Sequence, residues 1–143
     1  VGAAISLKAG ELNLGGEGQI YTGGFIAAII LSKLNFLPAA ISFSAACLSA
    51  FLISGLICFL SAFLKRIRNA DYLFTTYIIS AAIIPFIDGL ISGPFRSKTD
   101  NLLATAYIPQ NFRLTRILLP SPLNISAFLA LLICILFHYM LLL

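Results

Sequence analysis

The stretch GELNLGGEGQ, residues 10–19, sets Glu17 and two amide side chains among glycines, and the apolar run Ile20–Leu31 follows it directly. A carboxylate at the mouth of a hydrocarbon layer, or inside it, is costly and is tolerated mainly where the protein lines a cavity or a pathway. Glycine lets a helix break at such a point and lets neighbouring backbones approach closely. The stretch therefore indicates either a broken membrane helix that lines a polar pathway or a glycine-rich loop at the membrane surface.

The composition is that of a membrane protein. Hydrophobic residues make up 60% of the 143 residues, charged residues only 10%, and the mean hydropathy is +1.03. A soluble globular domain carries about 25% charged residues, so this chain has too few to cover a soluble core. The formal net charge of +4 is explained by membrane topology and lipid headgroup contact. No nucleic-acid-binding module is present, and nucleic acid is not an expected partner.

Four apolar segments predict an all-α fold, a polytopic bundle of about four membrane helices. The first segment carries glycine at five positions and is expected to be a glycine-broken helix. The second repeats small residues every four positions, which keeps them near one helix face suited to close packing, although chance in an Ala/Ser-rich segment is the alternative. The segments are Leu12–Leu34, Phe36–Leu64, Tyr72–Ser92 and Leu123–Leu143, and the small residues are Ser42, Ala46, Ala50, Ser54, Cys58 and Ala62.

The connections between these segments indicate how the helices are oriented. The basic cluster Lys65–Arg68 lies in a short connection, which favours the cytoplasmic side. The longer connection Gly93–Pro122 holds four prolines and is typical of an irregular exposed loop on the opposite side. The chain starts at Val1 rather than Met and stops inside an apolar run. We therefore expect residues 1–143 to be a portion of one longer membrane domain, cut at both ends.

A second acid, Asp88, lies late in the third segment, three residues after Pro85. It is either a cavity-facing acid beside a proline-distorted helix or an acid at the outer interface where the helix ends, and the nearby Ser92-Gly93-Pro94 favours the interface. The chain has no phosphate-binding loop, nucleophile motif or metal-ligand cluster, and its three cysteines lie in apolar runs. Neither a catalytic site nor a metal site is expected.

The run Asn13-Leu14-Gly15-Gly16-Glu17-Gly18-Gln19, followed by Gly23 and an apolar run, resembles the N-I-G-x-E-G-Q signature of bacterial ABC transporter permeases. The subgroup is the simple-sugar and nucleoside type, related to branched-chain amino acid permeases. Ile91–Arg96, with Leu119-Pro120 beyond it, resembles a second segment of the same subgroup at a matching distance. The resemblance implies that these motifs belong to the core of the translocation domain, over a middle portion of the family's length.

The resemblance gives the candidate site. It implies that the signature residues line the solute pathway or hold a helix break. Asp88, chosen for its place in the third apolar segment, is a secondary candidate. Tyr77 and Ile79 depart from the family pattern, which puts a polar pathway contact at Ile79 in doubt. The family's cytoplasmic stretch that docks on the ATPase is absent, so the coupling to ATP hydrolysis is not visible in this chain. The candidates are Asn13, Gly15, Gly16, Glu17, Gly18 and Gln19.

The implied function is that of the transmembrane permease subunit of an ATP-driven importer in the bacterial cytoplasmic (inner) membrane. It would move a nucleoside, a simple sugar or a flavin-like vitamin by alternating access. Its partners would be a cytoplasmic ABC ATPase that holds the ATP, a periplasmic or lipoprotein solute-binding protein, a second permease subunit and membrane lipid. The chain itself would bind no cofactor and catalyse no reaction. Two alternatives stay open: a proton- or ion-coupled secondary transporter that uses Glu17 and Asp88, and a non-transporting membrane scaffold subunit.

Overall fold

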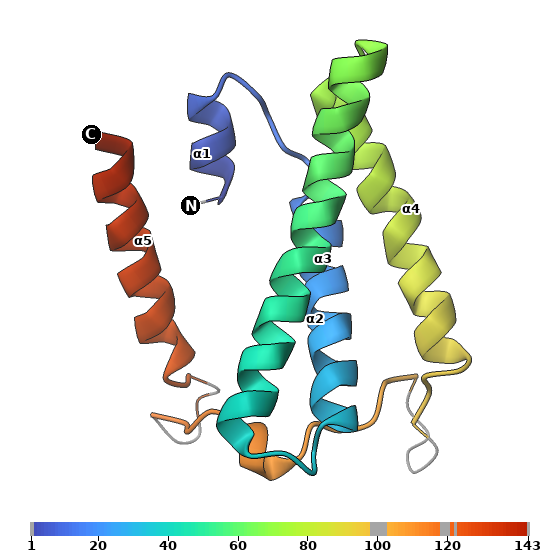
Figure 1. Cartoon of the computed structure of the whole chain (residues 1–143), viewed down its shortest axis with the longest axis vertical. Coiled ribbons are helices and arrows are strands. Elements are labelled where there is room, and N and C mark those ends of the chain that lie inside the picture. The colour runs from blue at the N-terminus through green and yellow to red at the C-terminus, as the bar shows by residue number, and fades with distance from the viewer. Residues whose placement is uncertain (1, 98–102, 118–120, 122, 143) are drawn as a thin grey trace. The chain divides into compact units, whose positions relative to one another are not determined.

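The protein is helical throughout its regular structure. A computed structural model describes residues 2–97, 103–117, 121 and 123–142 (Figure 1). The described part contains one isolated β-bridge, between Arg116 and Asn124, and no strand, so the predicted all-α class is confirmed. The helices are α1 (Gly2–Lys8), α2 (Gly16–Lys33), α3 (Ala39–Arg68), α4 (Tyr72–Ser92), the short 3-10 helix η1 (Gln110–Phe112) and α5 (Ser126–Leu142).

The chain forms two compact units. Residues 12–112 make the larger unit and contain α2, α3, α4 and η1. The chain before Leu12 and the chain after Phe112 make the smaller one, with α1 and α5. All of the candidate residues predicted from the sequence fall in the larger unit.

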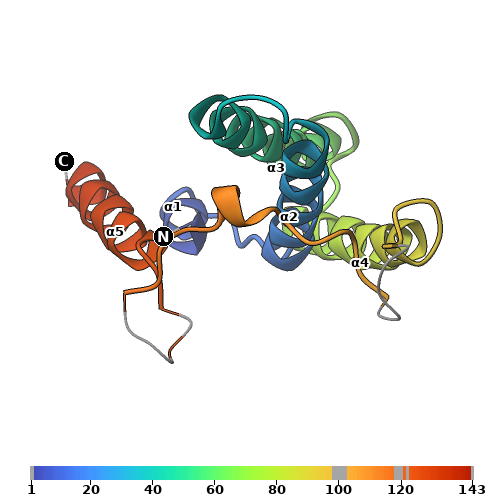
Figure 2. The ribbon, with the colours of Figure 1, turned by 90° about the horizontal axis from the view of Figure 1, so that it is seen from below.

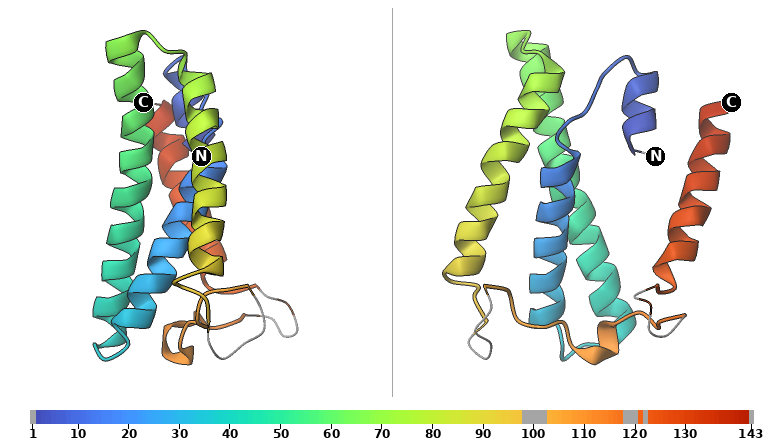
Figure 3. Two further views of the ribbon diagram at one scale, coloured as in Figure 1. Left: turned by 90° about the vertical axis from the view of Figure 1, so that its right-hand side faces the viewer. Right: turned by 180° about the vertical axis from the view of Figure 1, so that it is seen from behind.

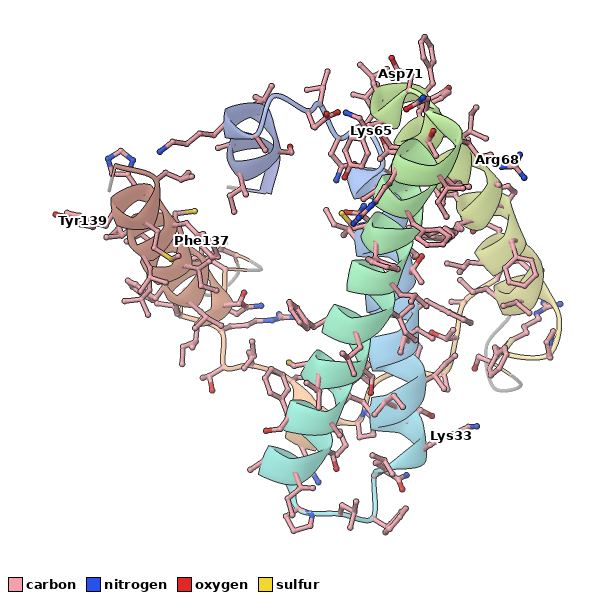
Figure 4. The ribbon with its side chains drawn as sticks, turned by 45° about the horizontal axis from the view of Figure 1, so that its top comes forward. Lys33, Lys65, Arg68, Asp71, Phe137 and Tyr139 are labelled. Carbon is pink, nitrogen blue, oxygen red and sulfur yellow. The ribbon has the colours of Figure 1, made fainter. Side chains whose placement is uncertain are left out.

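Helix α2 lies between α3 and α4 and packs against both (Figure 2). It runs antiparallel to α3, so the α2–α3 connection and the chain after α4 lie at one end of the unit and the α3–α4 turn lies at the other (Figure 3). Figure 4 shows Lys65, Arg68 and Asp71 at the turn end and Lys33 at the opposite end. The basic cluster Lys65–Arg68 and the start of the loop after α4 therefore lie at opposite ends of the larger unit, as the charge pattern predicts (Figures 3 and 4).

The prediction of a helix broken by glycines is wrong within α2. The helix runs without interruption from Gly16 to Lys33, and the chain leaves helical geometry only before it, between α1 and Gly16. Two of its glycines are contact points, because an added Cβ would lie 2.6 Å from Ser80 Oγ at Gly18 and 2.9 Å from Ser54 Oγ at Gly23. Glycine serves here for close helix packing rather than for a break.

The small residues of α3 form a packing face over part of their length. Ser42 and Ala46 are buried, and Ala50 and Ser54 are in contact range of Gly23. Farther along, Ala62 is exposed and Ser61 is buried instead. A four-residue repeat turns by about 40° at each step on a helix of 3.6 residues per turn, so it leaves any straight interface after a few turns.

Helices α3 and α4 are long and apolar enough to cross a membrane, and α5 is apolar but shorter. At about 1.5 Å per residue, the 30 residues of α3 reach about 45 Å, more than the hydrocarbon core of about 30 Å. Large apolar side chains cover the outer surface of α3 and leave it exposed, as expected of a surface that faces lipid: Leu48, Phe51, Leu52, Leu56 and Phe59. Four crossings stay a prediction.

The α3–α4 turn is specified locally by two residues. Asn69 ends α3 in the left-handed region at φ 52°, which asparagine tolerates better than most residues. Asp71 caps α4, because its carboxylate accepts a hydrogen bond of 3.3 Å from the Phe74 amide. These two side chains fix the start of α4 at Tyr72, where the sequence predicts it.

Candidate functional site

Helix α4 supplies hydrogen-bond acceptors to the start of α2. The backbone amide of Leu14 donates to Thr76 Oγ1 at 3.2 Å, and the amide of Gly18 donates to Ser80 Oγ at 2.8 Å. Thr76 and Ser80 are buried and one turn apart on α4. The first amides of a helix have no partner inside it, and in a membrane an unpaired amide costs several kcal/mol. The two hydroxyl groups therefore stabilise the beginning of α2.

Asn13 and Gly15 shape the chain just before α2. The Asn13 side-chain oxygen accepts a hydrogen bond of 2.8 Å from the Gly15 amide, which closes a local turn. Gly15 is buried, and an added Cβ there would lie 2.8 Å from the Thr76 carbonyl oxygen. A side chain at this position would push α2 and α4 apart. Asn13 and Gly15 thus hold the joint before α2.

Gln19 belongs to the contact between α2 and α3. Its carbonyl oxygen accepts a hydrogen bond of 2.9 Å from Ser54 Oγ. Its side-chain nitrogen, Nε2, is buried and has no hydrogen-bond partner among the residues that the structure describes. Gln19 does not line the surface groove beside α2 to which Glu17 belongs.

A groove of about 440 Å³ runs along one side of α2, and Glu17 is one of its lining residues. The α2 residues recur at helical spacing, and the far wall comes from the end of α4 and from the loop after it. Glu17 is exposed, and among the described residues no hydrogen bond or ion pair engages its carboxylate. The lining consists of Glu17, Ile20, Tyr21, Gly24, Phe25, Ala28, Ile91 and Thr105.

Tyr21 joins this groove to Asp88. The Tyr21 hydroxyl donates a hydrogen bond to Asp88 Oδ1, across the gap between α2 and α4. Tyr21 lies one turn after Glu17, on the same side of α2, and both residues line the groove. Ile91, which follows Asp88 by three residues on α4, lines it as well. Asp88 is itself exposed, at the end of α4 that leads into the loop.

The structure thus separates the candidate residues into three groups and leaves Gly16 outside them. Glu17 lines the groove, and Asp88 is tied to the groove through Tyr21. Asn13, Gly15 and Gly18 hold α2 to α4, and Gln19 contacts α3. Gly16 is partly exposed, and an added Cβ there would meet nothing within 4 Å.

Tyr21 was not predicted from the sequence to belong to the site. A tyrosine at the start of an apolar run is ordinary in a membrane helix, and nothing in its neighbours marks a partner. The one available signal is its spacing of four residues from Glu17, which places the two side chains on the same side of a helix.

Apolar helices that pack through small residues and hydroxyl groups are typical of membrane proteins, and here a mainly apolar groove with a few polar side chains lies beside them. The chain is 37% identical over 112 residues to "Probable riboflavin import permease protein RfuC" of Treponema pallidum (strain Nichols). The match covers 78% of this chain and 30% of the length of that relative. The resemblance to ABC transporter permeases, over a portion of their length, is therefore confirmed. No family model matches the chain, and no solved structure matches it.

Proposed function

We propose that this chain is part of the transmembrane subunit of an ATP-driven importer in the bacterial cytoplasmic membrane, and that its solute is riboflavin or a flavin-like vitamin. The observation that carries the proposal is the identity of 37% to a riboflavin import permease. The groove supports it, because apolar walls with a few polar groups are common in sites for small organic molecules. Among the solutes that the sequence leaves open, the flavin-like vitamin is the one that the relative favours.

The proposal includes the partners of such a subunit. A cytoplasmic ATPase would bind and hydrolyse ATP, a periplasmic or lipid-anchored binding protein would deliver the solute, and a second permease subunit would complete the pathway. Each partner would favour one orientation of the pathway by binding one state more tightly, which is how a ligand shifts a conformational equilibrium. This chain would itself catalyse no reaction. Its helices would line the pathway and change how they pack against one another.

The contacts of α2 with α3 and α4 are compatible with a helix that shifts against its neighbours. The first half of α2 touches α3 and α4 through glycine and hydroxyl groups, and large side chains such as Leu31 enter the contact with α3 only near its end. Such surfaces bring backbones close and need little side-chain rearrangement when helices shift against each other. The hydrogen bonds of Gly18 and Gln19 would then fix the position of α2 in each state.

Deletion of the coding segment in the host that encodes it tests the proposal. We expect energised uptake of radiolabelled riboflavin to fall to the diffusive level, and uptake of ribose and uridine to stay unchanged. Depletion of ATP should stop the uptake, whereas collapse of the proton gradient with ATP maintained should not. Unchanged riboflavin uptake in the deletion strain would overturn the choice of solute. Uptake that collapses with the proton gradient alone would support a secondary transporter.

A further inference from the structure

The groove beside α2 carries acidic groups and, among the described residues, no basic side chain lines it. Glu17 is exposed at the groove, and Asp88 adjoins it through Tyr21. The lysine on the same helix, Lys33, lines an adjoining depression that shares Ala28 and Thr105 with the groove. Lys33 follows Glu17 by 16 residues, about 24 Å along a helix, which exceeds the screening length of about 8 Å at physiological salt.

The polar atoms of the groove are mainly hydrogen-bond acceptors. An ionised glutamate accepts and cannot donate. The Tyr21 hydroxyl donates its hydrogen bond to Asp88, so towards another group the Tyr21 oxygen can only accept. Asp88 therefore acts as a positioning residue, which holds Tyr21 as an acceptor against the groove. A solute that satisfies Glu17 and Tyr21 must bring donors.

Apart from Thr105, the remaining lining residues carry no polar side chain, and they leave room for a flat body. Gly24 is exposed and has no side chain, and an added Cβ there would meet nothing within 4 Å. Phe25 is held in place by an edge-on contact with Phe95, with ring centroids 5.5 Å apart. The groove thus combines an open strip along α2 with a fixed aromatic side chain.

We propose that this groove selects its solute by charge: it admits neutral or cationic molecules that bear hydrogen-bond donors on a flat apolar body, and it excludes phosphorylated ones. This inference rests on the proposed function, because it makes the groove part of the solute pathway. A phosphate group brings nearly two negative charges and no donors at neutral pH. It would face Glu17 with no basic side chain among the described lining residues to compensate it, in a medium of low dielectric constant where repulsion between like charges is strongest.

Thiol labelling of the assembled transporter in membrane vesicles tests the inference. Cys47, Cys58 and Cys134, which are free, are replaced by alanine or serine, and a single reporter is introduced by Gly24→Cys. We expect a cationic methanethiosulfonate to react with this reporter about tenfold faster than an anionic one, because clefts of one charge sign concentrate counter-ions. Adding Glu17→Gln should remove most of that preference.

Two comparisons make the labelling decisive. Asn35→Cys is the control, because Asn35 is exposed in the connection between α2 and α3, outside both helices, and does not line the groove. Ala28→Cys is a second reporter in the groove, in case Gly24→Cys does not assemble. Riboflavin should slow labelling at the two groove reporters but not at Asn35→Cys, and riboflavin phosphate at equal concentration should protect neither groove reporter.

The possible outcomes separate this inference from the proposed function. Equal labelling rates for both reagents, a preference that survives Glu17→Gln, or protection by riboflavin phosphate would each overturn charge selection by the groove, even in a transporter that imports riboflavin. No reaction at either groove reporter would overturn it too, because it would show that another part of the protein covers the groove. If the groove prefers the cationic reagent and is protected by a different neutral solute, and no riboflavin uptake is found, the proposal of riboflavin as the solute is refuted. Selection by charge in the groove is then still supported.

Discussion

Replacement of Gly18 by alanine should destabilise the contact between α2 and α4. An added Cβ at Gly18 would lie 2.6 Å from Ser80 Oγ, 2.8 Å from Ser80 Cα and 3.0 Å from Ser80 Cβ. The approach to the Ser80 backbone is decisive, because no side-chain rotation moves a backbone atom of α4 away. Ordinary van der Waals distances begin at 3.4 Å, so the two helices must separate by about 0.6 Å.

The expected cost follows from three terms. Overpacking of a close contact costs about 1–3 kcal/mol. The hydrogen bond from the Gly18 amide to Ser80 Oγ is weakened, and such bonds between membrane helices contribute about 0.6 kcal/mol on average. Alanine recovers up to about 1 kcal/mol because it favours the helix over glycine. The net loss in the free energy of unfolding is about 1–2 kcal/mol.

Unfolding of the purified subunit in mixed micelles, followed by far-ultraviolet circular dichroism, measures this loss. Gly55→Ala is the matched control, because it makes the same change at an exposed helical position with open space and should be neutral or stabilising. Combining Gly18→Ala with Ser80→Gly removes two of the three close atoms and should cost less than the sum of the single changes. If Gly18→Ala and Gly55→Ala unfold at the same midpoint, the close approach of α2 and α4 is refuted.

Three further changes test other contacts by the same measurement. Tyr21→Phe and Asp88→Ala should be non-additive, with a coupling of about 0.5–1.5 kcal/mol, and strictly additive losses would show that the two groups do not meet. Asp71→Ala should cost about 0.5–2 kcal/mol through loss of the α4 cap, whereas Asp71→Asn should cost a few tenths at most; equal losses would argue against capping. Ser54→Ala should cost about 0.6 kcal/mol, because its hydroxyl donates to the Gln19 carbonyl, and a neutral effect would contradict that bond.

The helices could be predicted where residues of special conformation border an apolar run. The third apolar segment is predicted as Tyr72–Ser92 and is observed with the same bounds, because Asp71 caps one end and Gly93-Pro94 follows the other. The first segment is predicted to be broken by its glycines, but it is helical without interruption from Gly16 to Lys33, because the sequence marks glycines but not the helices they touch. Helix α1 was not predicted, since its 7 residues are too few to show a helical period.

The groove depends on contacts that the sequence does not display. Glu17 could be selected from its glycine-rich surroundings, and Asp88 from its place in an apolar segment. Their connection runs through Tyr21, which is 67 residues from Asp88 in the chain. Only the register between α2 and α4 sets that contact, and the register depends on the fit of Gly18 against Ser80. No periodicity within either helix contains this information.

The hydroxyl groups of α4 that accept hydrogen bonds from the start of α2 bear on how the protein enters the membrane. Thr76 and Ser80 each follow their amide donors by 62 residues. At a synthesis rate of about 5–20 residues per second, α4 emerges from the ribosome about 3–12 s after α2. During that interval the amides of Leu14 and Gly18 lack these acceptors and need water or the insertion machinery instead. The start of α2 can thus reach its final hydrogen bonding only after α4 has been made.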